Sequence, residues 1–237
     1  MTARHTLEEL NRQITNCKRC PRLVEWRERV AREKRAAYAD WDYWGRPVPG
    51  FGDPGAWLLI VGLAPAAHGA NRTGRMFTGD RSGDFLYAAL HRAGLANQAE
   101  STSGDDGLKL RGAYITAALR CAPPGNKPAP AERDNCREYL ERELDLLTDV
   151  QVILTLGAYA FNHVLRILRG QERGRGHRVP SPMPKFVHGG VVELGPGRPV
   201  VIASYHPSQQ NTFTGKLTPS MLDQVFSRAR AFAGPRT

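Results

Sequence analysis

The sequence lacks any long apolar run. No stretch approaches the ~18 uninterrupted apolar residues that a membrane-spanning helix needs, and the first residues are polar where a secretory signal would be apolar. Internal repeats and low-complexity domains are missing as well. These absences argue against a membrane protein, a secreted precursor or a repeat array, and we expect a cytoplasmic protein.

Lysine is scarce, although the chain is basic. Of the 33 basic residues only six are lysine and 27 are arginine, and the net charge is +10. Arginine is suited to bidentate contact with phosphate, so a polyanion such as DNA is a plausible partner. Charge alone does not decide this, because chains from GC-rich genomes are also rich in arginine.

Cysteine occurs only four times, at Cys17, Cys20, Cys121 and Cys136. The first two form a C-x-x-C pair, and the other two lie far along the chain. In a reducing compartment such a set favours metal or cluster ligation over disulfides. Thiolates suit both zinc and iron-sulfur clusters, and free buried cysteines are the remaining alternative.

The 237 residues have the composition of one globular domain, with 41% hydrophobic and 24% charged residues. We therefore expect a single domain over residues 1–237, acting as a monomer. Continuous apolar runs predict strands that are buried on both faces, at residues 57–63, 113–119, 150–156 and 200–205. Helical patterns lie between and after them, at residues 82–93, 131–147, 158–168 and 219–233.

This alternation predicts an α/β fold: a three-layer αβα sandwich around a central four-stranded parallel sheet. Before the first strand, residues 7–38 have the pattern of a helix, a cysteine turn and a second helix. Two polar, glycine-rich segments, residues 101–107 and 170–176, are the expected mobile insertions.

Ligands of open parallel sheets bind beyond the carboxyl ends of the strands. Three loops there are unusual, at residues 62–79, 121–130 and 206–218. The first contains glycines that allow close approach of a ligand, two arginines suited to phosphate, Arg72 and Arg75, and an aromatic side chain, Phe77. It contains neither the G-x-G-x-x-G pattern nor the lysine of a Walker A loop. Phe77 as a core residue and Asp80 as a helix cap are the simpler alternatives.

The last loop begins with His206 and Pro207. A proline disfavours the helical conformation in the residue before it, so His206 is expected to be extended at the strand tip with its ring facing the crevice. The polar tip that follows can hydrogen-bond to base edges or wedge into a base step. Its residues are Gln209, Gln210, Asn211, Thr212 and Phe213.

With its GLAPAAHG start, its HPS-x-x-N loop and its four cysteines, the chain resembles the uracil-DNA glycosylase superfamily, specifically family 5. The resemblance covers nearly the whole chain. It implies an enzyme of base excision repair that flips uracil out of double-stranded, and also single-stranded, DNA and hydrolyses its glycosidic bond. It further implies a range of other bases, including hypoxanthine, hydroxymethyluracil and ethenocytosine. A narrow uracil glycosylase resembling family 4 and a non-catalytic DNA-binding module with a metal are the alternatives.

The resemblance also assigns roles to residues. His206, Asp80 and Asn126 match catalytic positions, and the four cysteines match the ligands of a structural 4Fe-4S cluster. The base-binding positions are Phe77, Gly62, Ala64, Ala66 and His68. The expected DNA contacts are Arg72, Arg75, Gln209, Gln210, Asn211, Phe213 and Lys216.

One departure from the superfamily pattern concerns the water-activating group. Other families place an acidic or amide residue early in the first motif, where this chain has Leu63, Ala66 and Ala67. The resemblance therefore does not identify the residue that activates water. A pocket with fewer fixed polar contacts fits a broader range of bases.

Overall fold

A computed structural model describes residues 3–170 and 179–233. Its centre is a mixed sheet in the order β1-β3-β2-β4-β6-β5. The four inner strands are parallel and span β2 (Leu58–Gly62), β3 (Ala113–Ala117), β4 (Val152–Leu156) and β6 (Val200–Ser204). The predicted parallel strands are thus confirmed, each within two residues of its expected ends.

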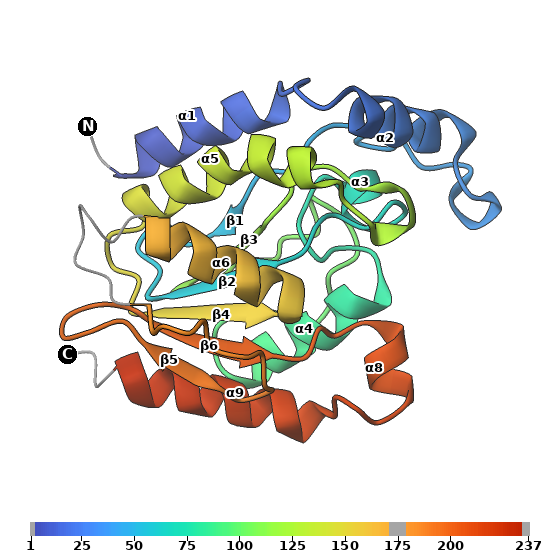
Figure 1. Ribbon diagram of the computed structural model, residues 1–237. Coiled ribbons are helices and arrows are strands. Elements are labelled where there is room, and N and C mark those ends of the chain that lie inside the picture. Colours follow the sequence, from blue (N-terminus) through green and yellow to red (C-terminus); the bar gives the residue numbers. More distant parts are fainter. Residues whose placement is uncertain (1–2, 171–178, 234–237) are drawn as a thin grey trace.

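The sheet is covered on both faces, which gives three layers (Figure 1). One face carries α4 (Arg81–Arg92) and α9 (Pro219–Ala233), and the other carries α6 (Ala158–Gly170), with α5 (Pro130–Leu146) beside it. Alternate residues of one strand pack into different cores: Leu58 and Ile60 face α4 and α9, whereas Leu59 and Val61 face α6. Burial on both faces explains why these strands are continuous apolar runs rather than alternating ones.

Two short antiparallel strands extend the expected four-stranded sheet at its edges. β1 (Phe51–Gly52) pairs with β3, and β5 (Val191–Glu193) pairs with β6. Both are too short, and too closely flanked by glycine, to give a strand pattern in the sequence.

The expected amino-terminal arrangement is present as α1 (Ala3–Thr15), the cysteine turn and α2 (Pro21–Glu33). α1 packs along α5, and α2 lies beside the one-turn helix α3 (Ala70–Thr73) that follows β2 (Figure 1). A short 3-10 turn, η1 (Ala36–Tyr38), leads from α2 toward the sheet. Most of segment 170–176, which we expected to be mobile, lies outside the described residues. No described helix is long and apolar enough to span a membrane.

A buried ion pair connects the end of β3 to α5. Arg120 and Glu143 have exposures of 1% and 0%, and Glu143 also accepts a hydrogen bond from the Thr116 hydroxyl at 2.7 Å. Arg120 is adjacent to Cys121 in the sequence. The network therefore holds in place the start of the loop that leads from Cys121 to α5, the helix that contains Cys136. Removing one partner of such a pair leaves an uncompensated buried charge.

We expect Arg120→Met to destabilise the fold strongly, by about 3–5 kcal/mol, because the buried Glu143 would lose its ion-pair partner. Urea unfolding at neutral pH measures this change. The matched control is Arg92→Met, which removes an ion pair with Asp223 that is 45% and 40% exposed. Its effect should be below about 1 kcal/mol. Equal losses in the two variants would contradict the role assigned to the buried pair.

Candidate active site

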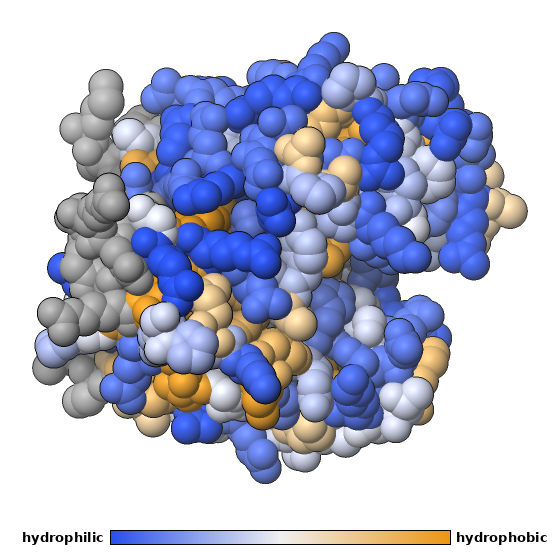
Figure 2. All heavy atoms as spheres, viewed as in Figure 1, coloured by the Kyte–Doolittle hydropathy of each residue, from blue (hydrophilic) through white to orange (hydrophobic). Residues whose placement is uncertain are grey.

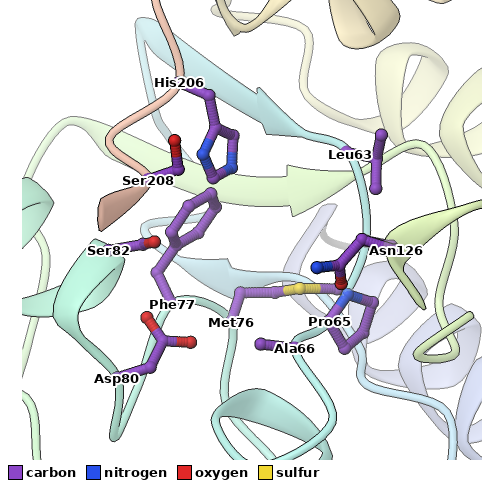
Figure 3. A pocket seen from close by; sticks show the side chains of 11 residues that line it. Leu63, Pro65, Ala66, Met76, Phe77, Asp80, Ser82, Asn126, His206 and Ser208 are labelled. Carbon is purple, nitrogen blue, oxygen red and sulfur yellow. The ribbon is translucent and has the colours of Figure 1, made fainter. Parts of the chain in front are cut away.

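A cavity of about 290 Å³ opens at the carboxyl ends of the parallel strands. Figure 3 shows its side chains converging from the loop after β2, the start of α4, the loop after β3 and the loop after β6. The sequence-predicted residues in its wall are Ala64, Ala66, Phe77, Asp80, Asn126 and His206. Three loops that are far apart in the sequence therefore form one site, as the position of strand ends in a parallel sheet requires.

His206 lies two residues beyond β6, and its ring faces that of Phe77, with the centroids 5.8 Å apart and the planes inclined by 32°. Asn211 holds it in place, because the Asn211 amide donates to the His206 carbonyl oxygen at 2.8 Å. Burial lowers the pKa of His206 to about 4. The imidazole is therefore neutral at pH 7, with one nitrogen able to donate and the other able to accept.

Phe77 reaches the cavity through an unusual backbone conformation. Its φ is +54°, which is uncommon for a bulky residue and is held here by the surrounding loop. The ring lies against the end of β2, where a Cβ on residue 62 would come within 2.8 Å of it. Gly62 therefore contributes by its lack of a side chain, and it leaves the face of Phe77 available for a flat ligand.

Asp80 serves as helix cap and pocket residue at once. Its Oδ1 accepts a hydrogen bond from the backbone N–H of Gly83 at 3.0 Å, at the start of α4. Its other oxygen lies against the backbone at Gly69, where a Cβ would stand only 2.1 Å away. Burial raises the pKa of Asp80, while the N–H groups of Gly83 and Ser82 and the charge of Arg72 act in the opposite direction.

Asn126 enters the pocket from η2 (Pro124–Asn126), the turn between the two distant cysteines. It has a φ of +58°, a conformation that asparagine tolerates better than most residues. Arg22 of α2 steadies this segment by donating to the Lys127 carbonyl oxygen at 3.2 Å and by pairing with Glu132. The turn that carries the Asn126 side chain is therefore exposed to solvent but held in place by Arg22.

His68, an expected base-binding residue, is not in the wall of the cavity. Its Nδ1 lies 3.0 Å from the hydroxyl of Tyr43, which belongs to the aromatic segment between α2 and β1. Burial, together with the charges of Arg35 and Arg72, lowers the pKa of His68. The structure therefore places this ring in a contact between loops rather than against a bound base.

Arg72 and Arg75, which we expected to contact phosphate, are both buried in this structure, with exposures of 3% and 5%. Arg75 pairs with Asp106, and the pKa of Asp106 falls to about 2, because its bonds to Arg75 and to backbone N–H groups outweigh the effect of burial. Asp106 also accepts from the N–H groups of Thr102 and Leu108, so it organises segment 101–107, which we expected to be mobile.

The exposed residues at the mouth lie on α8 (Gln209–Phe213) and just after it. Phe213 is 69% exposed, and Lys216 is exposed above the ring of Tyr205. In Figure 2 the right-hand edge of the molecule is hollowed between the part that carries α8 and the part that carries α2 (Figure 1). The expected DNA contacts Gln209, Gln210, Asn211, Phe213 and Lys216 are therefore on the rim of the site.

Sequence reasoning missed several residues of the site. Arg81, exposed at the start of α4, places its guanidinium 5.8 Å from the ring of Phe213, and it stands next to Asp80 in the sequence. The remaining wall residues are Leu63, Pro65, Met76, Ser82 and Ser208. All except Ser82, which lies at the start of α4, belong to the two loops already singled out, so their position in the sequence was the available signal. Only the direction of each side chain was unknown.

The four cysteines meet in one buried cluster between α1, α2, the end of β3 and α5. None forms a disulfide. Burial raises the pKa of Cys121 to about 12 and that of Cys136 to about 11. Arg27, with an exposure of 3%, donates to the Cys121 sulfur at 2.9 Å. In residues 3–170 and 179–233, no three side chains of the metal-binding types converge on one ion position.

Comparison with known proteins adds to this geometry. Residues 49–230 match the sequence profile of the uracil DNA glycosylase superfamily. The chain is 56% identical to the type-5 uracil-DNA glycosylase of Mycobacterium tuberculosis over 95% of its own length and 81% of the relative's. It is 49% identical to the type-5 uracil-DNA glycosylase of Thermus thermophilus, covering 93% of this chain and 95% of that one.

Similarity to type-4 enzymes is weaker. The type-4 uracil-DNA glycosylase of Archaeoglobus fulgidus is 27% identical over 86% of this chain and 82% of its own. With a profile match over most of its length and several type-5 relatives at far higher identity, this chain belongs to the type-5 family of the uracil-DNA glycosylase superfamily.

Proposed function

We propose that this protein excises uracil and other deaminated or modified bases from DNA by hydrolysing the bond between base and sugar. One observation carries the proposal: Phe77 and His206, from loops far apart in the sequence, lie next to each other in the wall of one cavity, with 5.8 Å between ring centroids (Figure 3). An aromatic face and a neighbouring hydrogen-bond donor are what a flat heterocycle with carbonyl oxygens requires.

A base inside a duplex cannot reach this cavity, so the nucleotide has to be extruded at a cost of a few kcal/mol, least for a mispaired base. The rim supplies the groups for this step. Phe213 is an exposed apolar side chain that can occupy the space left by the base. With Arg72 and Arg75 buried, the phosphate contacts pass to exposed cations near the mouth, namely Arg81, Lys127 and Lys216.

Cleavage leaves negative charge on the carbonyl oxygens of the departing base and an electron-poor sugar. His206, neutral and fixed by Asn211, donates a hydrogen bond to a base oxygen. Such a preorganised donor contributes on the order of 10² to 10³ in rate. Asp80, if ionised in the complex, orients the attacking water and favours the developing positive charge on the sugar. Asn126 supplies a further polar contact from the opposite wall.

The breadth of substrates follows from the composition of the wall. At the end of β2 it consists of Leu63, Ala64, Pro65 and Ala66, whose side chains carry no hydrogen-bonding group. A site rejects a near-analogue strongly only when the analogue leaves buried polar groups without partners. With no polar side chain in this part of the wall, we expect hypoxanthine, hydroxymethyluracil and ethenocytosine to be accepted besides uracil. Restriction to uracil is the alternative. It requires Asn126 to form hydrogen bonds that only the edge of uracil can satisfy.

We also propose that Cys17, Cys20, Cys121 and Cys136 hold a structural 4Fe-4S cluster. Two features of the donor set support this. The four thiols gather in one cluster of mostly buried residues, and thiolates are the ligands that such iron-sulfur clusters use. In addition, Arg27 is a buried cation directed at Cys121, and thiolate ligation would supply the negative charge that it lacks. The cluster would join both ends of the Asn126 segment to the amino-terminal helices.

The function is tested with duplexes that each contain one uracil, hypoxanthine, hydroxymethyluracil or ethenocytosine, followed by alkali to reveal abasic sites. We expect wild-type protein to cleave more than one of them. His206→Ala should lower the single-turnover rate at least tenfold on uracil, because one preorganised donor is lost, while DNA binding is largely kept. An inactive wild-type protein that still binds DNA would favour the non-catalytic module, and cleavage of uracil alone would favour narrow specificity.

The stacking role of Phe77 is tested through Gly62→Ala. The new Cβ would lie 2.8 Å from the Phe77 ring, so the ring has to move out of position. We expect a roughly tenfold slower excision, the scale of a small misplacement of a reacting group. Gly55→Ala is the matched control, because a Cβ there meets its nearest neighbour at 3.6 Å. Equal rates for the two variants would show that Phe77 does not orient the base.

The metal proposal predicts that anaerobically purified protein contains iron and acid-labile sulfide in equal amounts and has the broad visible absorbance of thiolate-bound iron. Cys136→Ser should lose both and unfold at a lower temperature, since the segment around Asn126 loses its anchor. Zinc without iron would support a mononuclear site instead. Protein that holds neither metal would leave the four cysteines as free thiols and contradict the proposal.

A further inference from the structure

Arg72 has an unusual environment for an arginine at the edge of a DNA-binding site. It is 3% exposed, and its hydrogen bonds within the described chain go to carbonyl oxygens, not to a carboxylate. Burying a guanidinium carries a desolvation cost that an apolar side chain of similar length would avoid. The positions of its partners indicate what this cation does.

The first set of contacts is aromatic. The Arg72 guanidinium carbon lies 3.9 Å from the ring centroid of Tyr38 and 4.0 Å from that of Trp41. Both rings belong to the segment after α2. The same segment also contacts the main chain of α3, where the N–H of Trp44 donates to the Arg72 carbonyl oxygen at 2.9 Å. Ring faces attract a cation most strongly when water is excluded, so Tyr38 and Trp41 form an aromatic clamp on Arg72.

The second set of contacts joins two separate parts of the loop after β2, which forms one side of the pocket. Arg72 Nε donates to the carbonyl oxygen of His68, and Nη2 donates to that of Gly79, each at 2.8 Å. The Gly79 carbonyl belongs to the peptide unit that leads into Asp80. Because a peptide unit is planar, fixing this carbonyl also fixes the orientation of the Asp80 backbone. The fit is close, since a Cβ on residue 79 would lie 2.5 Å from Nη2.

We propose that Arg72 is a positioning residue: held by the aromatic clamp of Tyr38 and Trp41, it fixes the Gly79 carbonyl and thereby sets the Asp80 carboxylate in the pocket. The inference rests on the proposed function, in which Asp80 acts during base excision. It assigns to the aromatic segment after α2 a contribution to excision that is made through Arg72.

The charge of Arg72 gives the proposal a separate signature. Burial and the neighbouring charge of Asp84 raise the pKa of Asp80, whereas the N–H groups of Gly83 and Ser82 and the guanidinium of Arg72 lower it. Tyr87, which is buried close to Asp80, is un-ionised at neutral pH and adds no charge. Removing the cation therefore raises the pKa of Asp80, and the pH below which excision declines moves upward.

The test compares Arg72→Met, Arg72→Lys and Trp41→Leu with wild type in single-turnover excision of uracil over about pH 4 to 9, with the DNA dissociation constant and the melting temperature measured in parallel. We expect each variant to excise at least about tenfold more slowly while the dissociation constant changes by less than about twofold. The acid limb should move to higher pH in Arg72→Met and stay in place in Arg72→Lys, which keeps the charge.

The matched control is Arg46→Met, which removes an exposed arginine that packs on Trp44 at 5.8 Å and should change neither rate nor pH profile. Wild-type rates in Trp41→Leu would overturn the proposal even if Arg72→Met does not fold. So would a rate loss in Arg72→Met without movement of the acid limb. If wild-type protein excises no base at all, the proposed function fails instead, and the two failures are thereby distinguished.

Discussion

The site depends on one constraint, the position of β4 between β2 and β6. All three strands are parallel, so the loops that follow β2 and β6 leave the sheet at the same edge and only one strand apart. That spacing brings Phe77 and His206 to 5.8 Å between ring centroids. An order that placed β2 and β6 farther apart would move the two loops, and with them the two rings, away from each other.

Buried cations organise the loops around this cavity. Arg75 fixes segment 101–107 through Asp106, and Arg120 connects β3 to α5 through Glu143. Arg27 approaches the cysteine cluster. Each guanidinium joins segments that are distant in sequence, a task for which its planar set of donors is well suited. Several arginines near the site thus stabilise the fold. The exposed cations are the ones that remain available to contact phosphate.

The amino-terminal helices contact the loops that form the pocket. α2 begins at the cysteine turn, runs beside α3 and is followed by the aromatic segment that contacts the loop after β2. The Asn71 amide donates to the Arg27 carbonyl oxygen at 3.3 Å, which joins α2 directly to that loop. A change at the cysteine cluster therefore has a short structural route to the pocket.

The sequence by itself determined the parallel strands, the helices around them and the loops that hold the chemistry, because each leaves a local pattern of apolar runs, glycines and prolines. His206 and Phe77 were singled out as candidates for that reason, and the family resemblance assigned their roles. The tertiary structure decided the properties that local patterns do not specify. The direction of each side chain is one such property: Arg72 and Arg75 have the residue type of a DNA contact, yet packing turned them inward. The strand order, the short edge strands and the position of Arg81 also depend on contacts between distant segments, which local sequence does not specify.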